Sequence, residues 1–194
     1  MKAILGIKKG MTRVFVEDKM VPVTIVDTSE CKVARRNGDW VELGLGINKK
    51  TKKSLQGMYK ELTFVPKFLI SLRGNWGDEV SVGDDVKAEF FDIGDSVNII
   101  GVTKGKGFQG VVKRWGFKGG QRTHGQSDRL RAPGSIGAGT DPGRVLKGKK
   151  MGGRMGQNRK TIKNTKVVGL SENHMLISGA IPGANGDLIT IYKE

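Results

Sequence analysis

The sequence predicts a mainly β fold, in which a small closed β-barrel with short helices carries a long, irregular, basic arm inserted into it. Two observations support this prediction. Both ends of the 194-residue chain consist of short runs rich in β-branched and aromatic residues, separated by turn formers. Between them, residues 103–166 hold 17 of the 34 Lys and Arg residues and 15 of the 30 Gly residues, but only two acidic residues. Residues 1–102 and 167–194 are therefore expected to form the barrel domain, and residues 103–166 the glycine-rich extension.

The N-terminal part begins with a series of predicted strands. Four runs have the composition of strands, namely residues 11–16, 21–27, 31–36 and 40–47. Asn37-Gly38, between the last two runs, predicts a β-hairpin, because a type I′ turn needs positive φ at both of its central residues.

Two short helices are expected after these strands. Apolar residues recur at helical spacing within residues 55–62 and again within residues 68–72, with Pro66 between the two sets. Because proline interrupts a helix, the two sets are assigned to separate helices.

The pattern Gly-Asp-x-Val occurs three times, at residues 77–80, 83–86 and 94–97. Glycine and aspartate favour turns, so each copy is predicted to be a turn that leads the chain into a strand. Further strands are predicted at residues 97–102, 166–170, 175–181 and 188–192. The strands that follow the arm need partners in the N-terminal part, and this pairing would close the barrel around the insertion.

The excess positive charge is confined to the arm. The chain has a formal charge of +15, while the residues outside 103–166 carry 17 basic and 17 acidic side chains, which balance. A glycine-rich segment of like charges buries too little apolar surface to offset the entropy of ordering, so it should order on a polyanion. Each neutralised phosphate releases condensed counterions, which favours RNA or DNA. A membrane is disfavoured, because the glycines leave no apolar stripe at helical spacing.

One stretch of the chain has the opposite charge. Residues 78–95 carry seven acidic side chains and one lysine. Phosphate should repel this stretch, which is expected to face solvent or a basic neighbour.

Cys31 is the only cysteine, so no disulfide can form within the chain, and its expected role is that of a small buried hydrophobic residue. The first ten residues lack the apolar run of a signal peptide, and no stretch is long enough to span a membrane. A soluble, cytoplasmic protein without membrane contact is expected.

Two patterns suggest enzyme chemistry but lack its context. Residues 105–110 read G-x-G-x-x-G after a predicted strand, but a nucleotide-binding loop must open a helix, and Gly116, Gly119 and Gly120 should break one. His124, Ser127 and Asp128 lie close in sequence, whereas the members of a catalytic triad come from separated elements. Ligand clusters for zinc or magnesium are also missing. No cofactor, metal or catalytic residue is expected, although an RNA-modifying or RNA-cleaving enzyme and a DNA-compacting protein remain the alternative functions.

The arm has side chains suited to RNA. Its cations can neutralise phosphates, its rings can stack on unpaired bases, and its glycines allow close backbone approach. The residues predicted to bind RNA are Lys104, Lys106, Lys113, Arg114, Trp115, Lys118, Arg122, His124, Arg129, Arg131, Arg144, Lys147, Lys149, Lys150, Arg154, Arg159 and Lys160. Two further rings are those of Phe108 and Phe117.

The tip of the arm is placed at residues 133–143. Pro-Gly pairs at 133–134 and 142–143 bracket a segment without cations, and such pairs reverse the chain without regular structure. Because cations flank this bend on both sides, it is expected to reach deepest into the RNA. The tip residues are Pro133, Gly134, Ser135, Ile136, Gly137, Ala138, Gly139 and Thr140.

Several blocks of the chain match one known family. They are residues 4–12, 131–137 and 148–156, together with a spaced signature of Phe91, Asn98, Gly101, Thr103, Gly105-Lys106-Gly107, Gly110 and Arg114. Through these blocks the chain resembles the large-subunit (50S) ribosomal protein L3 family. The resemblance extends over essentially the whole chain. The length, and the lack of eukaryotic-type extensions, resemble the bacterial members.

This resemblance implies a β-barrel of the translation-protein type and a structural, non-catalytic role in the large ribosomal subunit. It implies direct binding to 23S rRNA, an early role in assembly near the 3′ end of that RNA, and an arm directed toward the peptidyl transferase centre. Neighbours from the L fourteen and L nineteen ribosomal protein families are implied, and a homo-oligomer is not. Some bacterial members carry a methylated glutamine directly after the stretch matched by residues 134–137. This chain has Ala138 there, so that modification is expected to be absent.

Overall fold

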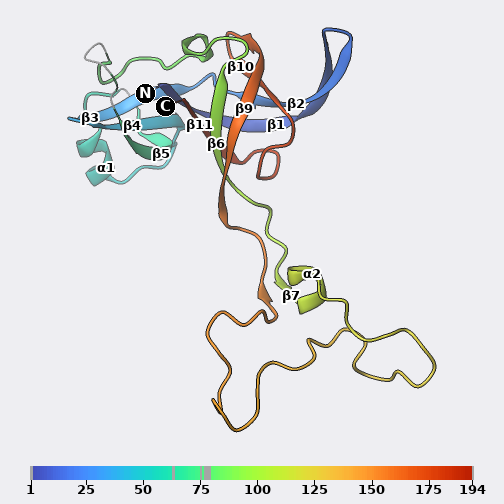
Figure 1. Ribbon diagram of the computed structural model, residues 1–194. Coiled ribbons are helices and arrows are strands. Elements are labelled where there is room, and N and C mark those ends of the chain that lie inside the picture. Colours follow the sequence, from blue (N-terminus) through green and yellow to red (C-terminus); the bar gives the residue numbers. More distant parts are fainter. Residues whose placement is uncertain (1, 63, 75, 77–79, 194) are drawn as a thin grey trace. The chain divides into compact units, whose positions relative to one another are not determined.

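The computed structural model describes residues 2–62, 64–74, 76 and 80–193. The chain forms two compact units, which are shown in Figure 1. The barrel unit consists of Met1–Thr103 and Arg159–Glu194, and the arm unit consists of Lys104–Asn158. The predicted mainly β character is confirmed, because strands account for most of the regular structure.

Six antiparallel strands make up the main sheet of the barrel unit, and β6, β9 and β10 can be followed side by side in Figure 1. In order of pairing they are β1 (Lys2–Val16), β11 (Leu188–Lys193), β6 (Ser96–Val102), β9 (Arg159–Ser171), β10 (His174–Ser178) and β2 (Lys19–Asp27). β2 pairs in turn with β1, so the ring of strands closes. Closure leaves no unpaired edge in this sheet. Strands from before and after the arm are interleaved in the ring, since β6 lies between β11 and β9 and β2 pairs with β10.

Side chains alternate between buried and more exposed positions along several of these strands. In β10, for example, Met175 and Ile177 are buried while His174 is exposed. β1 is instead buried without interruption from Ala3 to Gly6, because it also packs against β3 (Cys31–Asn37) and β4 (Trp40–Ile47). A strand that is covered on both faces does not alternate between apolar and polar residues, so the sequence pattern does not reveal it. The strand predicted at residues 11–16 therefore covers only the C-terminal part of β1.

A second sheet, in the order β3-β4-β5, overturns one helix prediction. Residues 68–72 were expected to be helical but lie in strand β5 (Pro66–Arg73), which pairs with β4 through partners such as Leu43 and Ile70. Pairing with strand β4 outweighs the weak helical spacing of a short apolar run. The first expected helix is present as α1 (Lys53–Met58), but it begins two residues before the predicted range of 55–62 and ends four residues before that range does.

The hairpin predicted at Asn37-Gly38 is present, but its turn is displaced by one residue. Asn37 pairs with Trp40, so Gly38 and Asp39 are the central residues. Only Gly38, with φ of 56°, has positive φ, which is the pattern of a type II′ turn and not of the expected type I′. The β1–β2 hairpin instead has positive φ at both central residues, Glu17 and Asp18.

Two of the three Gly-Asp-x-Val turns lie in described parts of the chain. Gly83 and Gly94 have φ of 96° and 95°, a conformation that glycine adopts without strain. The turn at Gly94 leads directly into β6, as predicted, whereas the turn at Gly83 leads to a single β-bridge between Asp85 and Lys32. Residues 77–79 of the first copy lie outside the described residues.

Two members of the spaced signature have structural roles in the barrel unit. Phe91, directly after the 3₁₀ turn η1 (Ala88–Phe90), is 1% exposed and belongs to the main hydrophobic core. A Cβ atom at Gly101 would lie 2.8 Å from Ile189 Cδ1. Glycine at this position therefore permits close packing between β6 and β11.

One lysine is buried in this unit. Lys8 is 6% exposed, and its ammonium donates hydrogen bonds to the carbonyl oxygens of Ile181 and Gly183 at 2.9 and 3.0 Å. Burying an ammonium group is costly unless it is hydrogen-bonded. These bonds hold the turn before β11 against β1.

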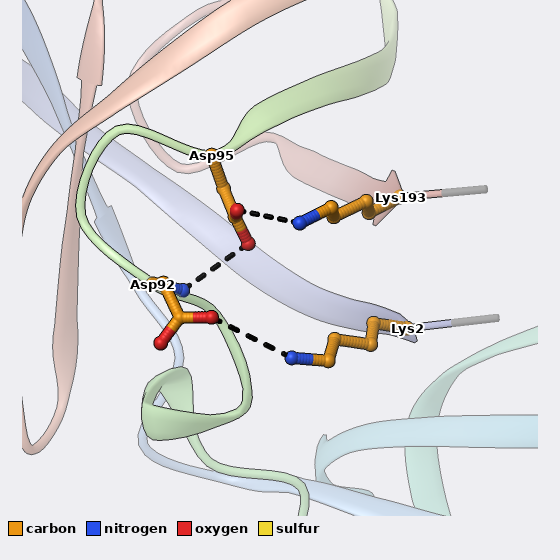
Figure 2. A network of polar contacts seen from close by, with 4 residues as sticks. All are labelled: Lys2, Asp92, Asp95 and Lys193. Carbon is orange, nitrogen blue, oxygen red and sulfur yellow. Dashed lines mark hydrogen bonds and ion pairs between the residues drawn. The ribbon is translucent and has the colours of Figure 1, made fainter.

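A polar network, drawn in Figure 2, joins the first and last strands to the turn before β6. Lys193 Nζ lies 2.5 Å from Asp95 Oδ1, and Lys2 Nζ lies 3.8 Å from Asp92 Oδ2. The backbone N–H of Asp92 donates to Asp95 Oδ2 at 3.2 Å. The hydrogen bond from Lys193, helped by that from Asp92, lowers the pKa of Asp95 below its usual value.

We expect this network to make stability depend on pH in the acid range. A carboxylate whose pKa is lowered by folding stabilises the native state above its unfolded pKa of about 3.9 and loses that contribution as pH falls through the folded value. Asp95→Asn should therefore lower the urea midpoint at pH 7, and this deficit should shrink below about pH 4. Asp18→Asn, in the exposed β1–β2 turn, is the control. A deficit for Asp95→Asn that stays constant down to pH 2 would contradict this account.

Candidate nucleic-acid interface

The arm unit begins and ends in a short ordered segment that we call the neck, defined as residues 104–116 and 150–157. Strands β7 (Phe108–Gln109) and β8 (Gly153–Arg154) pair antiparallel within it. Two further backbone bonds extend this ladder, from Lys106 N–H to the Met155 carbonyl and from Met155 N–H to the Gly107 carbonyl, both 2.9 Å. The neck is therefore a small antiparallel ribbon.

The G-x-G-x-x-G segment at residues 105–110 does open a helix, contrary to expectation. Helix α2 (Val111–Trp115) follows it directly. The helix has only five residues and ends at Gly116, which has φ of 75° and acts as the left-handed cap. Gly116 therefore ends the helix, as predicted, but only after one helical turn has formed.

Trp115 contacts the opposite side of the neck. Its indole N–H donates to the Met151 carbonyl at 2.8 Å, and Arg114 Nη1 donates to the same oxygen at 2.9 Å. The Arg114 guanidinium lies 5.0 Å from the Trp115 ring centroid and the Lys150 ammonium 5.7 Å from it, both within the range of cation–π attraction. Trp115 was predicted to bind RNA; the structure shows its contacts with Arg114, Lys150 and Met151 of its own chain.

Glycines allow the two sides of the neck to approach closely. A Cβ atom at Gly156 would lie 2.1 Å from the Lys104 carbonyl oxygen, and one at Gly153 would lie 2.5 Å from Arg114 Nη1. Sequence reasoning recognised the glycine richness but missed these roles of Gly153 and Gly156 and that of the Met151 carbonyl. A backbone acceptor leaves no signature in the sequence of side chains.

The remainder of the arm unit, residues 117–149, is called the distal loop and contains no helix or strand. Its few internal bonds include that from Gly120 N–H to the Leu130 carbonyl, at 2.8 Å, and a number of local turns. Nearly all of its side chains are exposed. Within residues 104–158, all of which the structure describes, Val111 of the neck is the only buried side chain.

The predicted tip is exposed throughout, from Pro133 to Gly143. Ser135 Oγ donates to the Gly137 carbonyl at 2.9 Å, and Gly143 N–H donates to the Gly139 carbonyl at 3.3 Å, so the segment folds back on itself locally. No atom lies within 4 Å of the position that a Cβ atom would occupy at Gly139. The uncharged bend is therefore open to a partner.

Fifteen of the seventeen residues predicted to bind RNA lie in the arm unit, and all fifteen are exposed except Arg114, which is half-buried. The other two, Arg159 and Lys160, begin strand β9 and pair with Val102 and Gly101. The arm unit thus ends at Asn158, whereas the expected extension ran to residue 166. Charge continues into β9, so composition alone placed that end too late.

The electrostatics of the arm unit are those of an unneutralised polycation. It carries 13 Lys and Arg residues against Asp128 and Asp141. Across residues 104–158, no lysine or arginine forms an ion pair, while ion pairs such as that of Lys9 with Asp27 lie in the barrel unit. Free cations of this density favour a polyanionic ligand.

The groups considered for catalysis do not assemble. The Ser127 hydroxyl donates to Asp128 Oδ1 at 3.2 Å and not to His124. Burial raises the pKa of the Cys31 thiol to about 12, so this side chain is unreactive at neutral pH. No group of three or more His, Cys, Asp and Glu side chains within the described parts of the chain is placed to hold a metal ion.

Wherever the structure describes a helix, that helix is too short or too polar to cross a membrane.

Comparisons with known proteins agree with the resemblance. The family model for ribosomal protein L3 matches residues 45–180. Large ribosomal subunit protein uL3 of Herpetosiphon aurantiacus is 43% identical over 100% of this chain and 96% of its own length. The proteins of the same name from Chlorobium limicola and Deinococcus radiodurans are each 41% identical, covering 100% and 98% of this chain and 99% and 94% of their own. With this agreement over its whole length, the chain belongs to the ribosomal protein L3 (uL3) family.

Proposed function

We propose that this protein is a structural, non-catalytic constituent of the large ribosomal subunit that binds 23S rRNA directly through its arm unit. The observation that carries this proposal is the set of exposed cations in residues 104–158, none of which has an ion-pair partner within that segment. The names of the relatives describe large-subunit proteins, which supports the same function.

The physical chemistry of the arm unit fits RNA better than a small anion. Its cations are spread along the chain, so they match a lattice of phosphates, and each contact releases counterions. The distal loop buries almost nothing of its own and therefore has to gain its order from the ligand. Exposed rings such as Phe108, which is 79% exposed, are available to stack on unpaired bases.

The finer parts of the proposal follow from family membership. The six-stranded barrel is of the translation-protein type, and the protein acts early in subunit assembly, near the 3′ end of the rRNA. The tip of the arm, Pro133 to Thr140, is directed toward the peptidyl transferase centre. The protein works in the cytoplasm within the ribosome, next to members of the L fourteen and L nineteen families, without a membrane contact and without forming a homo-oligomer.

The acidic stretch is proposed to face away from RNA. Within its described part, Asp85 lies 2.7 Å from the Lys32 ammonium, while Asp92 and Asp95 pair with Lys2 and Lys193. These pairs reduce the negative charge but leave Asp84 and Glu89 exposed. Exposed carboxylates repel phosphate, so this surface suits solvent or a basic protein.

Binding to transcribed 23S rRNA over a range of salt concentrations tests the proposal. The logarithm of the binding constant should fall linearly with the logarithm of salt, with a slope of about 0.7 to 0.9 for each phosphate neutralised. Arg129→Gln combined with Arg131→Gln should reduce that slope by about 2. Lys49→Gln combined with Lys50→Gln, an exposed pair in the barrel unit, is the matched control and should leave the slope unchanged. Equal losses in both variants would show that the arm is not the main binding surface.

The same assay separates the alternative functions. Duplex DNA that competes as well as 23S rRNA would indicate a DNA-compacting protein. Modification or cleavage of the RNA after incubation with the purified protein would indicate an enzyme. Intact RNA, bound in preference to DNA, is the expected result.

A further inference from the structure

We infer that the neck is folded before RNA binds, that Trp115 is the residue that holds it together, and that it presents a fixed set of cations as the first docking site for RNA. This inference rests on the proposed function for the identity of the ligand. The contacts that form the neck all lie within the arm unit.

The first support is the hydrogen bonding of the neck compared with that of the distal loop. The β7–β8 pair, the two bonds between residues 106–107 and Met155, and the side-chain bonds from Arg114 and Trp115 to the Met151 carbonyl tie together segments about 40 residues apart in sequence. In the distal loop the longest-range backbone bond joins Gly120 to Leu130. Closing a long loop has an entropic cost, and only the neck has a set of bonds that offsets it.

The second support is the chemistry of Trp115. The neck holds six cations, namely Lys104, Lys106, Lys113, Arg114, Lys150 and Arg154, and no acidic residue, so its two sides repel each other. The indole group opposes this repulsion by attracting Arg114 and Lys150 to its ring while its N–H binds the Met151 carbonyl. Trp115 is thus a positioning residue, and the cations around it are the groups that meet phosphate.

The third support is the requirement for glycine at position 156. A Cβ atom there would lie 2.1 Å from the backbone oxygen of Lys104, which cannot rotate away as a flexible side chain would. Gly148 has nearly the same φ, 81° against 77°, but its Cβ position has no neighbour within 4 Å. An alanine would therefore have similar backbone strain at position 148 and at position 156. Only the alanine at 156 would also push the two sides of the neck apart.

Pre-folding changes how the arm binds RNA. A ligand that meets groups already in place loses less conformational entropy on binding than one that must order them. The neck would bind first and fix the two ends of the distal loop, so that the loop explores a smaller volume as it orders on the RNA. A defect in the neck should therefore weaken binding without changing the number of phosphates neutralised.

Amide hydrogen exchange of the RNA-free protein tests whether the neck is folded. Amides of residues 106–116 and 153–156 should exchange at least about tenfold more slowly than those of residues 121–148. Gly156→Ala and Trp115→Leu should remove this protection, whereas Gly148→Ala should retain it. As a control for folding of the barrel unit, the amides of strands β1 and β11 should exchange at the same slow rate in all variants. A neck that exchanges as fast as the distal loop in the natural protein would overturn the inference, as would equal effects of the two alanine variants.

Binding of the same variants to 23S rRNA tests whether the neck acts as a positioning device. Gly156→Ala and Trp115→Leu should bind about tenfold more weakly with an unchanged salt slope, because the count of cations is the same. Trp40→Leu, at a half-exposed tryptophan in the barrel unit, should bind normally. A slope that falls with the affinity would mean that these residues act through phosphate contacts, and it would contradict a positioning role. A protected neck in a protein that binds no RNA would refute the proposed function and leave the pre-folded neck supported.

Discussion

Arginine in place of Gly139 should leave incorporation into large subunits intact and slow peptide-bond formation by the assembled particles. The Cβ position at Gly139 is open, and its φ lies outside the left-handed region, so the free protein can accept a side chain there. If the tip lies beside catalytic RNA, the new side chain must displace nucleotides. A displacement of about 1 Å at a reacting group reduces the rate on the order of a hundredfold.

The measurement is reconstitution of subunits with each variant, followed by separate assays of incorporation and peptide-bond formation. Gln121→Arg adds the same charge to an exposed position of the distal loop outside the tip, and it should affect neither assay. Lys147→Ala with Lys149→Ala should have the converse effect, with weaker incorporation and a salt slope reduced by about 2. Tip variants that fail to incorporate, combined with charge variants that assemble normally, would reverse the roles assigned within the arm.

Phe91→Ala should destabilise the barrel unit more than any surface change. Truncating a buried phenylalanine leaves a cavity and costs about 3–5 kcal/mol, against a total stability of about 5–15 kcal/mol for a typical domain. Its neighbour Phe90 is 49% exposed, so Phe90→Ala should cost less than about 1 kcal/mol. Urea unfolding followed by circular dichroism measures both changes.

This pair of variants tests why Phe91 belongs to the family signature. A large loss of stability for Phe91→Ala, with normal RNA binding of the fraction that remains folded, would assign Phe91 to the core. Equal losses for the two phenylalanines would instead show that the turn as a whole, and not the buried ring, supports the barrel.

The strands were predictable where local pattern and tertiary environment agree. Short runs such as β2 and β4 lie close to their predicted positions, because they are rich in β-branched and apolar residues and the turns around them have turn-forming residues. β5 was mistaken for a helix since its apolar residues fit either period over such a short length. Its pairing with β4, which the local pattern of β5 does not show, decided the outcome.

The candidate site divides in the same way. The basic, exposed character of residues 104–158 could be inferred from composition, because charge and glycine content alone determine that the segment cannot bury a core of its own. The neck could not be inferred, since it depends on the Met151 carbonyl meeting Trp115 across 36 residues of chain.

By itself, then, the sequence determined the mainly β class of the protein, its family and the polycationic composition of its arm. These properties are sums over residues or local matches, and they do not depend on which residues meet. The tertiary structure decided the partner of each strand, the end of the arm at Asn158 and the role of Trp115 within the neck. Each of these depends on contacts between residues far apart in the chain, where backbone atoms and glycine positions matter as much as side-chain type.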